Sequence, residues 1–129
     1  MKLIDLYESE QITASQLRAV EVYADKLFKE LGIDIAFTKH FVDRVNDPRN
    51  GKQITVQELG ALFRDAMSKA GAKIAKMNKG AEAVIIDMES DINLPFILKW
   101  DDSNQELDLV AKTVMRKKGF MTRTKKFHV

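Results

Sequence analysis

Residues 80–88 read GAEAVIIDM, and here the spacing of hydrophobic residues changes from the 3.6-residue period of a helix to the two-residue period of a strand. Three strand-like runs come after this change, at residues 81–88, 94–100 and 106–116. The polar turn of residues 101–104 joins the last two runs and predicts an antiparallel hairpin. The closing residues 125–129 are expected to add an edge strand.

The chain before Gly80 carries the signals of helices. Thr13 and Gln16 form a capping box, and apolar residues then recur at helical spacing up to Leu31, with Gly32 as the stop. A second capping box at Thr55 and Glu58 predicts a longer helix that frays near Gly71 or continues to Met77.

The segment between the two capping boxes predicts shorter elements. Residues 33–37 are apolar and partly β-branched, which indicates a short strand. Thr38 is a candidate N-cap for a short helix from Lys39 to about Asn46, which Pro48 and the Asn50-Gly51 pair end.

Helices first and strands afterwards predict an α+β fold, with the N-terminal helices packed on an antiparallel β-sheet. The 129 residues correspond to one domain that can bury its own core. We expect residues 1–80 to be mainly helical, with the short strand near 33–37. Residues 81–129 are expected to form the sheet and a basic C-terminal tail.

Composition excludes several classes of function. The chain has no cysteine, which removes disulfides, thiolate metal sites and thiol nucleophiles. His40 and His128 are the only histidines, and no phosphate-binding loop or serine-hydrolase motif is present, so no metal or cofactor is expected. No apolar run could span a bilayer, and Met1 to Glu10 carries no signal sequence, so no membrane association and a cytoplasmic protein are expected.

Charge is distributed unevenly along the chain. Residues 109–129 hold seven Lys and Arg and no acid, whereas residues 1–108 hold 14 Lys and Arg against 19 Asp and Glu. Segregated positive charge is typical of a protein that binds a polyanion, and the alternative is a solvated tail. The candidate binding residues are Lys112, Thr113, Lys117, Lys118, Arg123, Lys125 and Lys126.

One pair of residues on the short helix suggests chemistry. His40 and Arg44 are four residues apart and share a helix face, while Phe41 and Val45 turn to the core. An imidazole near neutrality beside a fixed guanidinium suits phosphodiester chemistry, because one group moves a proton and the other holds the phosphate. The alternative is a surface histidine beside an acidic neighbour.

The third strand-like run predicts a cationic row. If residues 106–116 alternate as one strand, Lys112 and Arg116 lie on a common face and Thr113 points away unless a bulge intervenes. Trp100, Phe120 and Phe127 could supply surfaces for stacking unpaired bases. For Trp100 and Phe127, core packing is the favoured interpretation.

The stretch FTKHFVDRV at residues 37–45, followed by ITVQELGALF at 54–63, resembles the opening of the RelE-like ribonuclease fold. It looks most like the phage RegB-type endoribonucleases, in which a His-x-x-x-Arg helix precedes a longer helix and a curved antiparallel sheet. The likeness covers about residues 36–64 in motif and the rest in order of elements. It implies that His40 and Arg44 belong to an active site, although Arg64 stands where the RegB type has a second histidine.

The resemblance implies a metal-independent endoribonuclease that cleaves single-stranded RNA by attack of the 2′-hydroxyl on the phosphodiester. His40 and His128 would be the acid and base, and Arg44 and Arg116 would hold the phosphate. Two alternatives stay open. The chain could be a non-catalytic, phage-type nucleic-acid-binding module with a basic C-terminal groove. It could also be a virion or regulatory protein whose tail docks an acidic protein partner. A phage-encoded protein would act in the host cytoplasm.

Overall fold

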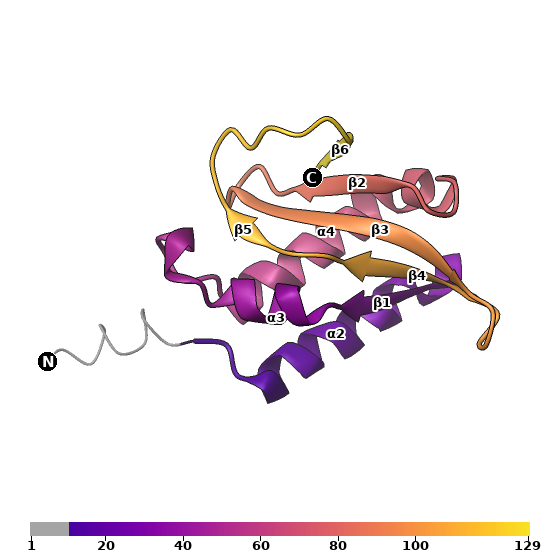
Figure 1. The fold of residues 1–129 in the computed structure, drawn as a ribbon, viewed down its shortest axis with the longest axis horizontal. Helices are drawn as coiled ribbons and strands as arrows, with labels where there is room; N and C mark the ends of the chain where they lie inside the picture. The colour runs from indigo at the N-terminus through magenta and orange to yellow at the C-terminus, as the bar shows by residue number, and fades with distance from the viewer. Residues whose placement is uncertain (1–10) are drawn as a thin grey trace, which may run out of the picture.

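The computed structural model describes residues 11–129 as helices gathered against a six-stranded sheet (Figure 1). The expectation about a signal sequence falls on Met1 to Glu10, which lie outside the described residues. Within residues 11–129 no helix has the length and apolar character needed to cross a membrane.

Local capping determines where the described helices begin. Helix α2 (Ala14–Phe28) and helix α4 (Val56–Ala75) both start at the predicted capping boxes, with both reciprocal hydrogen bonds present at Thr13 and at Thr55. Helix α3 (Lys39–Val45) starts at Thr38, whose Oγ1 accepts a hydrogen bond from the N–H of Phe41. Single turns of 3₁₀ helix follow α2 and α3, and they are η1 (Lys29–Leu31) and η2 (Pro48–Asn50).

The sheet is mixed. It contains β1 (Ile33–Phe37), β2 (Glu82–Ile86), β3 (Ile92–Asp101), β4 (Glu106–Ala111), β5 (Met115–Arg116) and β6 (Lys125–His128). The order is β1-β4-β3-β2-β6, and β5 also pairs with β3. Strands β2, β3 and β4 are antiparallel as predicted, but β1 runs parallel to β4 and β6 runs parallel to β2. The α+β class is therefore confirmed, and the expectation of a wholly antiparallel sheet is wrong.

The predicted strand 106–116 is interrupted by a β-bulge. Phe96 pairs with Ala111, and four residues earlier along β3, Ile92 pairs with Arg116, five residues later. The extra residue lies within residues 112–114 and shifts the alternation of side chains. Val114 is consequently buried in the core, and Arg116 lies on the opposite face from the one predicted by a continuous strand.

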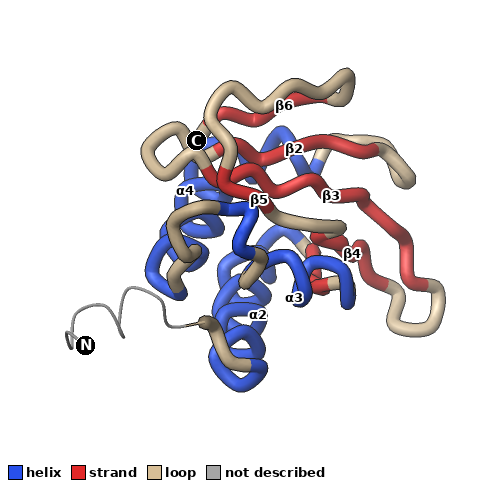
Figure 2. Tube along the Cα trace, turned by 60° about the vertical axis from the view of Figure 1, so that its left-hand side comes forward, coloured by secondary structure: helices blue, strands red, loops and turns tan. Residues whose placement is uncertain are grey.

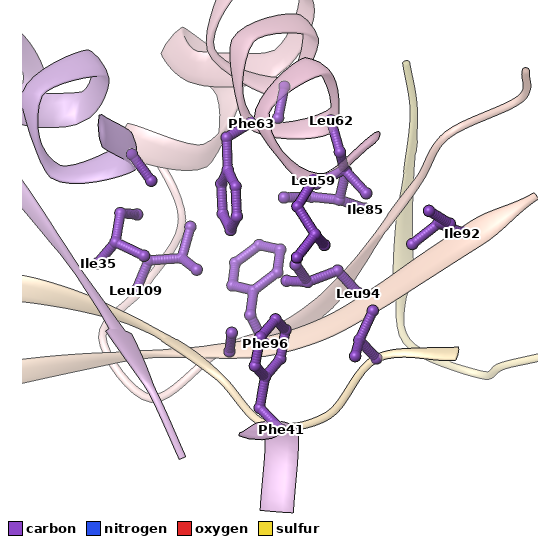
Figure 3. Close-up of a cluster of buried hydrophobic side chains, with 14 of the residues drawn as sticks. Ile35, Phe41, Leu59, Leu62, Phe63, Ile85, Ile92, Leu94, Phe96 and Leu109 are labelled. Atoms are coloured by element: carbon purple, nitrogen blue, oxygen red, sulfur yellow. The ribbon is translucent and has the colours of Figure 1, made fainter. Parts of the chain in front are cut away.

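The core lies between the sheet and the helices, which gather on one side of it (Figure 2). Figure 3 shows Phe63 and Leu59 of α4 meeting Phe96 and Leu94 of β3, with Phe41 of α3 closing one end. These five side chains are fully buried. Each aromatic residue removes a large apolar area from water, so their packing is the main force that holds α3 to the sheet.

Helix α2 also covers the free edge of β1. The N–H of Phe37 donates to Glu21 at 3.0 Å, and the N–H of Ile35 donates to Asp25 at 2.6 Å. These backbone donors point away from β4 and would otherwise lack a partner within the sheet. The two carboxylates therefore fix α2 along this edge.

Candidate nucleic-acid interface

The predicted His40 and Arg44 lie on α3 as expected from their spacing. His40 is exposed, and Arg44 is half-buried with its Nε 3.5 Å from Oδ2 of Asp47. This Nε is buried and has no hydrogen-bond partner among the described residues. Stacking of Phe41 on Phe37, with ring centroids 4.2 Å apart, fixes the helix beneath the pair. The arrangement offers an exposed imidazole one helical turn from a guanidinium whose Nε is buried beside Asp47.

The two histidines do not form a pair. Thr38 begins α3 and its N–H donates to the carbonyl of Ala111 on β4, which places His40 near that strand. His128 lies on β6, three strand spacings or about 14 Å across the sheet from β4. Phe127 points into the core, so His128 points to the face away from the helices. An acid and a base on opposite faces cannot act on one phosphodiester.

Arg116, the predicted phosphate ligand, is held inside the protein. Its guanidinium donates to both carboxylate oxygens of Glu58, at 2.7 and 2.9 Å, and to three backbone carbonyls. These carbonyls belong to Lys52, Gln53 and Ser90, at 2.9–3.2 Å. All five N–H donors of the guanidinium are thus occupied. We call this arrangement the Arg116 clasp; it joins β5 to the start of α4 and leaves no donor for a phosphate.

The clasp also sets the ionisation of Glu58. Partial burial raises the pKa of the Glu58 carboxyl, but hydrogen bonds from Arg116 and from the N–H of Thr55 lower the pKa by more. The net result is a pKa below the ordinary value of 4.5, so Glu58 is ionised at neutral pH. An ionised Glu58 keeps the two-pronged pairing with Arg116 intact.

Lys112 and Thr113 lie at the bulge. Lys112 forms an ion pair with Glu82 of β2, and its carbonyl accepts a hydrogen bond from Oγ1 of Thr38 at 2.8 Å. Thr113 is half-buried, and its Oγ1 has no hydrogen-bond partner in the described part of the chain. The bulge therefore contacts the start of α3. The prediction that Lys112 and Arg116 form one cationic row is wrong, because the bulge places them on opposite faces of the sheet.

The remaining predicted cations form an accessible surface. Five are exposed, and none makes a salt bridge with any residue of 11–129; they are Lys117, Lys118, Arg123, Lys125 and Lys126. They lie on the connection of residues 117–124 and on β6, drawn in yellow in Figure 1. We call these five residues the basic tail surface. None of these five cations is neutralised by an ion pair within the described residues, and residues 109–129 contain no acidic side chain.

The aromatic candidates divide between core and surface. Phe127 is only 5% exposed and packs near Phe96, which confirms core packing for this residue. Trp100 is 39% exposed, so the favoured core interpretation is wrong for it. Its indole lies under the ammonium of Lys79, with Nζ 4.3 Å from the ring centroid. Phe120 is half-buried on the connection to β6.

Comparison with known proteins adds no assignment. No protein-family model, curated protein or solved structure matches the chain.

A cluster of carboxylates lies at the β1–β4 edge, away from the basic tail surface. Asp34, Glu106 and Asp108 bring one oxygen each within 4.8 Å of the others, which is a donor set suited to a hard divalent cation. Burial, followed by repulsion from Asp34, raises the pKa of both Glu106 and Asp108. The sequence did not predict this cluster, because it depends on the parallel pairing that sets Asp34 opposite Asp108.

Proposed function

We propose that the chain binds single-stranded RNA through the basic tail surface. The observation that carries the proposal is the presence of five exposed cations within ten consecutive residues, none of them neutralised by a carboxylate of residues 11–129. A phosphate backbone that follows the connection and the β6 edge would meet these side chains, with Lys125 and Lys126 on opposite faces of that edge. It would release its condensed counterions, which drives binding without sequence readout. A single strand is favoured because its flexible backbone can follow an irregular connection.

The surface is well held for such a role. Strand β6 is paired with β2 along residues Lys125 to His128, and Phe127 anchors it in the core. At the other end of the connection, the N–H of Lys117 donates to the carbonyl of Asp91 at 2.9 Å. Anchoring at both ends limits the freedom that the segment would lose on binding RNA.

The test is a salt titration of RNA binding. Fluorescence anisotropy of a labelled 12-nucleotide RNA would be measured for the wild type and for R123Q/K125Q/K126Q. If each cation meets one phosphate, the variant loses affinity for all sequences, and the slope of log K against log salt falls by about 2, at about 0.7 per contact.

The matched control removes the same charge elsewhere. The triple variant R18Q/K26Q/K29Q changes three exposed cations on α2 and η1, near the opposite edge of the sheet, and should bind like the wild type. Equal salt slopes for the wild type and the tail variant would contradict the proposal. So would weak, salt-independent binding by the wild type.

A second candidate is cleavage of the bound RNA, as the RelE-like resemblance implies. It is favoured by the exposed imidazole of His40, which lies one helical turn from the half-buried Arg44 on α3. With His128 on the other face, one histidine would have to act with Arg44 alone, and we expect slow cutting. His40→Ala should lower the rate by about 10² or more while RNA affinity stays unchanged. Intact RNA after prolonged incubation with the wild type would exclude cleavage and leave binding.

A further inference from the structure

A second cationic surface lies on α4 and on the connection that follows it. Residues 66–81 contain four lysines and no acid. All four side chains are exposed, and none makes a salt bridge within the described residues; they are Lys69, Lys73, Lys76 and Lys79. We call these four residues the lysine flank.

The packing of α4 determines where the lysine flank faces. A Cβ at Gly60 would lie 3.8 Å from Tyr23 of α2, and one at Gly71 would lie 3.2 Å from Leu31 of η1, so this side of α4 faces α2. At about 100° per residue, Lys69 and Lys73 lie about 160° around the helix from Gly71. They therefore face away from α2.

The far side of α4 leads to the β6 edge of the sheet. Helix α2 packs on β1 and covers its edge, and β6 lies at the opposite edge. The lysines that face away from α2 therefore point toward β2 and β6. Lys125 is on the helix side of β6, where its Nζ lies 5.4 Å from the Phe127 ring centroid. This residue links the lysine flank to the basic tail surface.

The lysine flank ends at Trp100. The N–H of Gly80 donates to the carbonyl of Leu98, which holds the connection after α4 against β3 and brings Lys79 over the indole. Trp100 is two residues from the buried Leu98 on β3, so the two side chains point to the same face. Trp100 therefore lies on the helix side of the sheet, as Lys125 does. The indole is 39% exposed, and the Lys79 ammonium lies over its ring. An unpaired base can stack on this ring by displacing the flexible Lys79 side chain to the side, where the ammonium can meet a phosphate.

We infer that the lysine flank and Trp100 extend the RNA-binding path beyond the tail, with Trp100 as a stacking site for an unpaired base. This inference rests on the proposed function. Phosphates contact Lys69, Lys73 and Lys76, and one base of the strand stacks on the indole beside Lys79. A duplex does not fit this site, because its bases are already stacked on one another.

Trp100 is the only tryptophan in the chain, so its fluorescence reports on this site directly. Titration of the wild type with a 12-nucleotide oligoadenylate should quench the indole emission, and an RNA duplex of equal length should quench it far less. Trp100→Leu should weaken binding of the single strand about tenfold, as loss of one stacked base does. Circular dichroism would confirm that this variant is folded.

The charge part of the site is tested with K69Q/K73Q/K76Q. Three lost phosphate contacts should lower the salt slope by about 2, while R18Q/K26Q/K29Q keeps the wild-type slope. The inference fails if K69Q/K73Q/K76Q binds like the wild type and the Trp100 emission is not quenched. The proposed function still stands in that case, provided that R123Q/K125Q/K126Q weakens binding. If the wild type does not bind the oligonucleotide at all, the proposed function fails and the inference with it.

Discussion

Replacing Arg116 by Met should destabilise the fold and leave RNA binding unchanged. The variant keeps a long apolar stem but removes all five donors of the Arg116 clasp, so the Glu58 carboxylate and three carbonyls lose their partner. Loss of one member of a fully buried ion pair costs about 3 to 5 kcal/mol. The side chains here retain 13% and 22% exposure, so water replaces part of the loss, and we expect a cost of about 2 to 3 kcal/mol.

The assay is unfolding by urea and by heat. A cost of this size corresponds to a fall in Tm of about 10 °C for a domain of this length. The pKa of Glu58 is lowered in the folded state, so the pair stabilises the protein above the ordinary pKa of 4.5, and this contribution is lost as the pH falls through the lowered value. The difference between the wild type and R116M should therefore shrink in acid.

Two matched variants separate charge from geometry. Arg116→Lys keeps the positive charge but cannot donate in two parallel bonds, and should recover only part of the stability. Glu58→Gln tests the partner. A surface substitution typically changes the free energy of unfolding by no more than about 0.5 kcal/mol. If R116M stays within that range of the wild type and binds RNA more weakly, Arg116 is a phosphate ligand. The structural role of the Arg116 clasp is then refuted.

Two further predictions concern stability. Burial, with repulsion from Asp34 and Glu21, raises the pKa of the Asp25 carboxyl to about 6. The folded protein therefore loses stability as the pH rises through that value, because the carboxyl must then ionise. Asp25→Asn, which can still accept from Ile35, should therefore stabilise the protein by about 1 kcal/mol at pH 7.5 after allowance for solvent screening, and by nothing at pH 4. Urea unfolding at both pH values checks this, and an equal effect at both would contradict it. Phe41→Ala should cost about 3 to 4 kcal/mol by calorimetry, because the ring is fully buried; a loss below 1 kcal/mol would mean that α3 is not fixed by core packing.

Local signals in the sequence predicted the helices and most strands. A capping box is decided within four residues, so Thr13 and Thr55 could be read without knowledge of the fold. The hairpin of β3 and β4 is likewise decided by a short turn. The strand 33–37 and the final edge strand were also predicted, but not their partners.

Pairing between distant segments could not be predicted. Strand β1 lies beside β4, 74 residues later, and nothing in either segment specifies the direction of the pairing. The bulge at 112–114 is a single extra residue, yet it moves Arg116 to the other face and thereby changes its role from ligand to clasp. The lysine flank was missed because its members meet only in the folded chain. Lys69 and Lys73 share a face through the turns of α4, and Lys79 joins them through the connection that Gly80 holds against β3.

The two edges of the sheet are protected in different ways, and this bears on how the protein behaves at high concentration. Along β1 the outward N–H groups of Ile35 and Phe37 are occupied by carboxylates of α2, which opposes the addition of another strand there. Strand β6 forms the other edge of the sheet in the described chain, and its exposed Lys125 and Lys126 repel the same edge of another copy. This repulsion opposes edge-to-edge pairing. Bound RNA or a glutamine variant neutralises that repulsion. Self-association, followed by light scattering, should therefore begin at the β6 edge under these conditions, and binding assays should be read at low protein concentration.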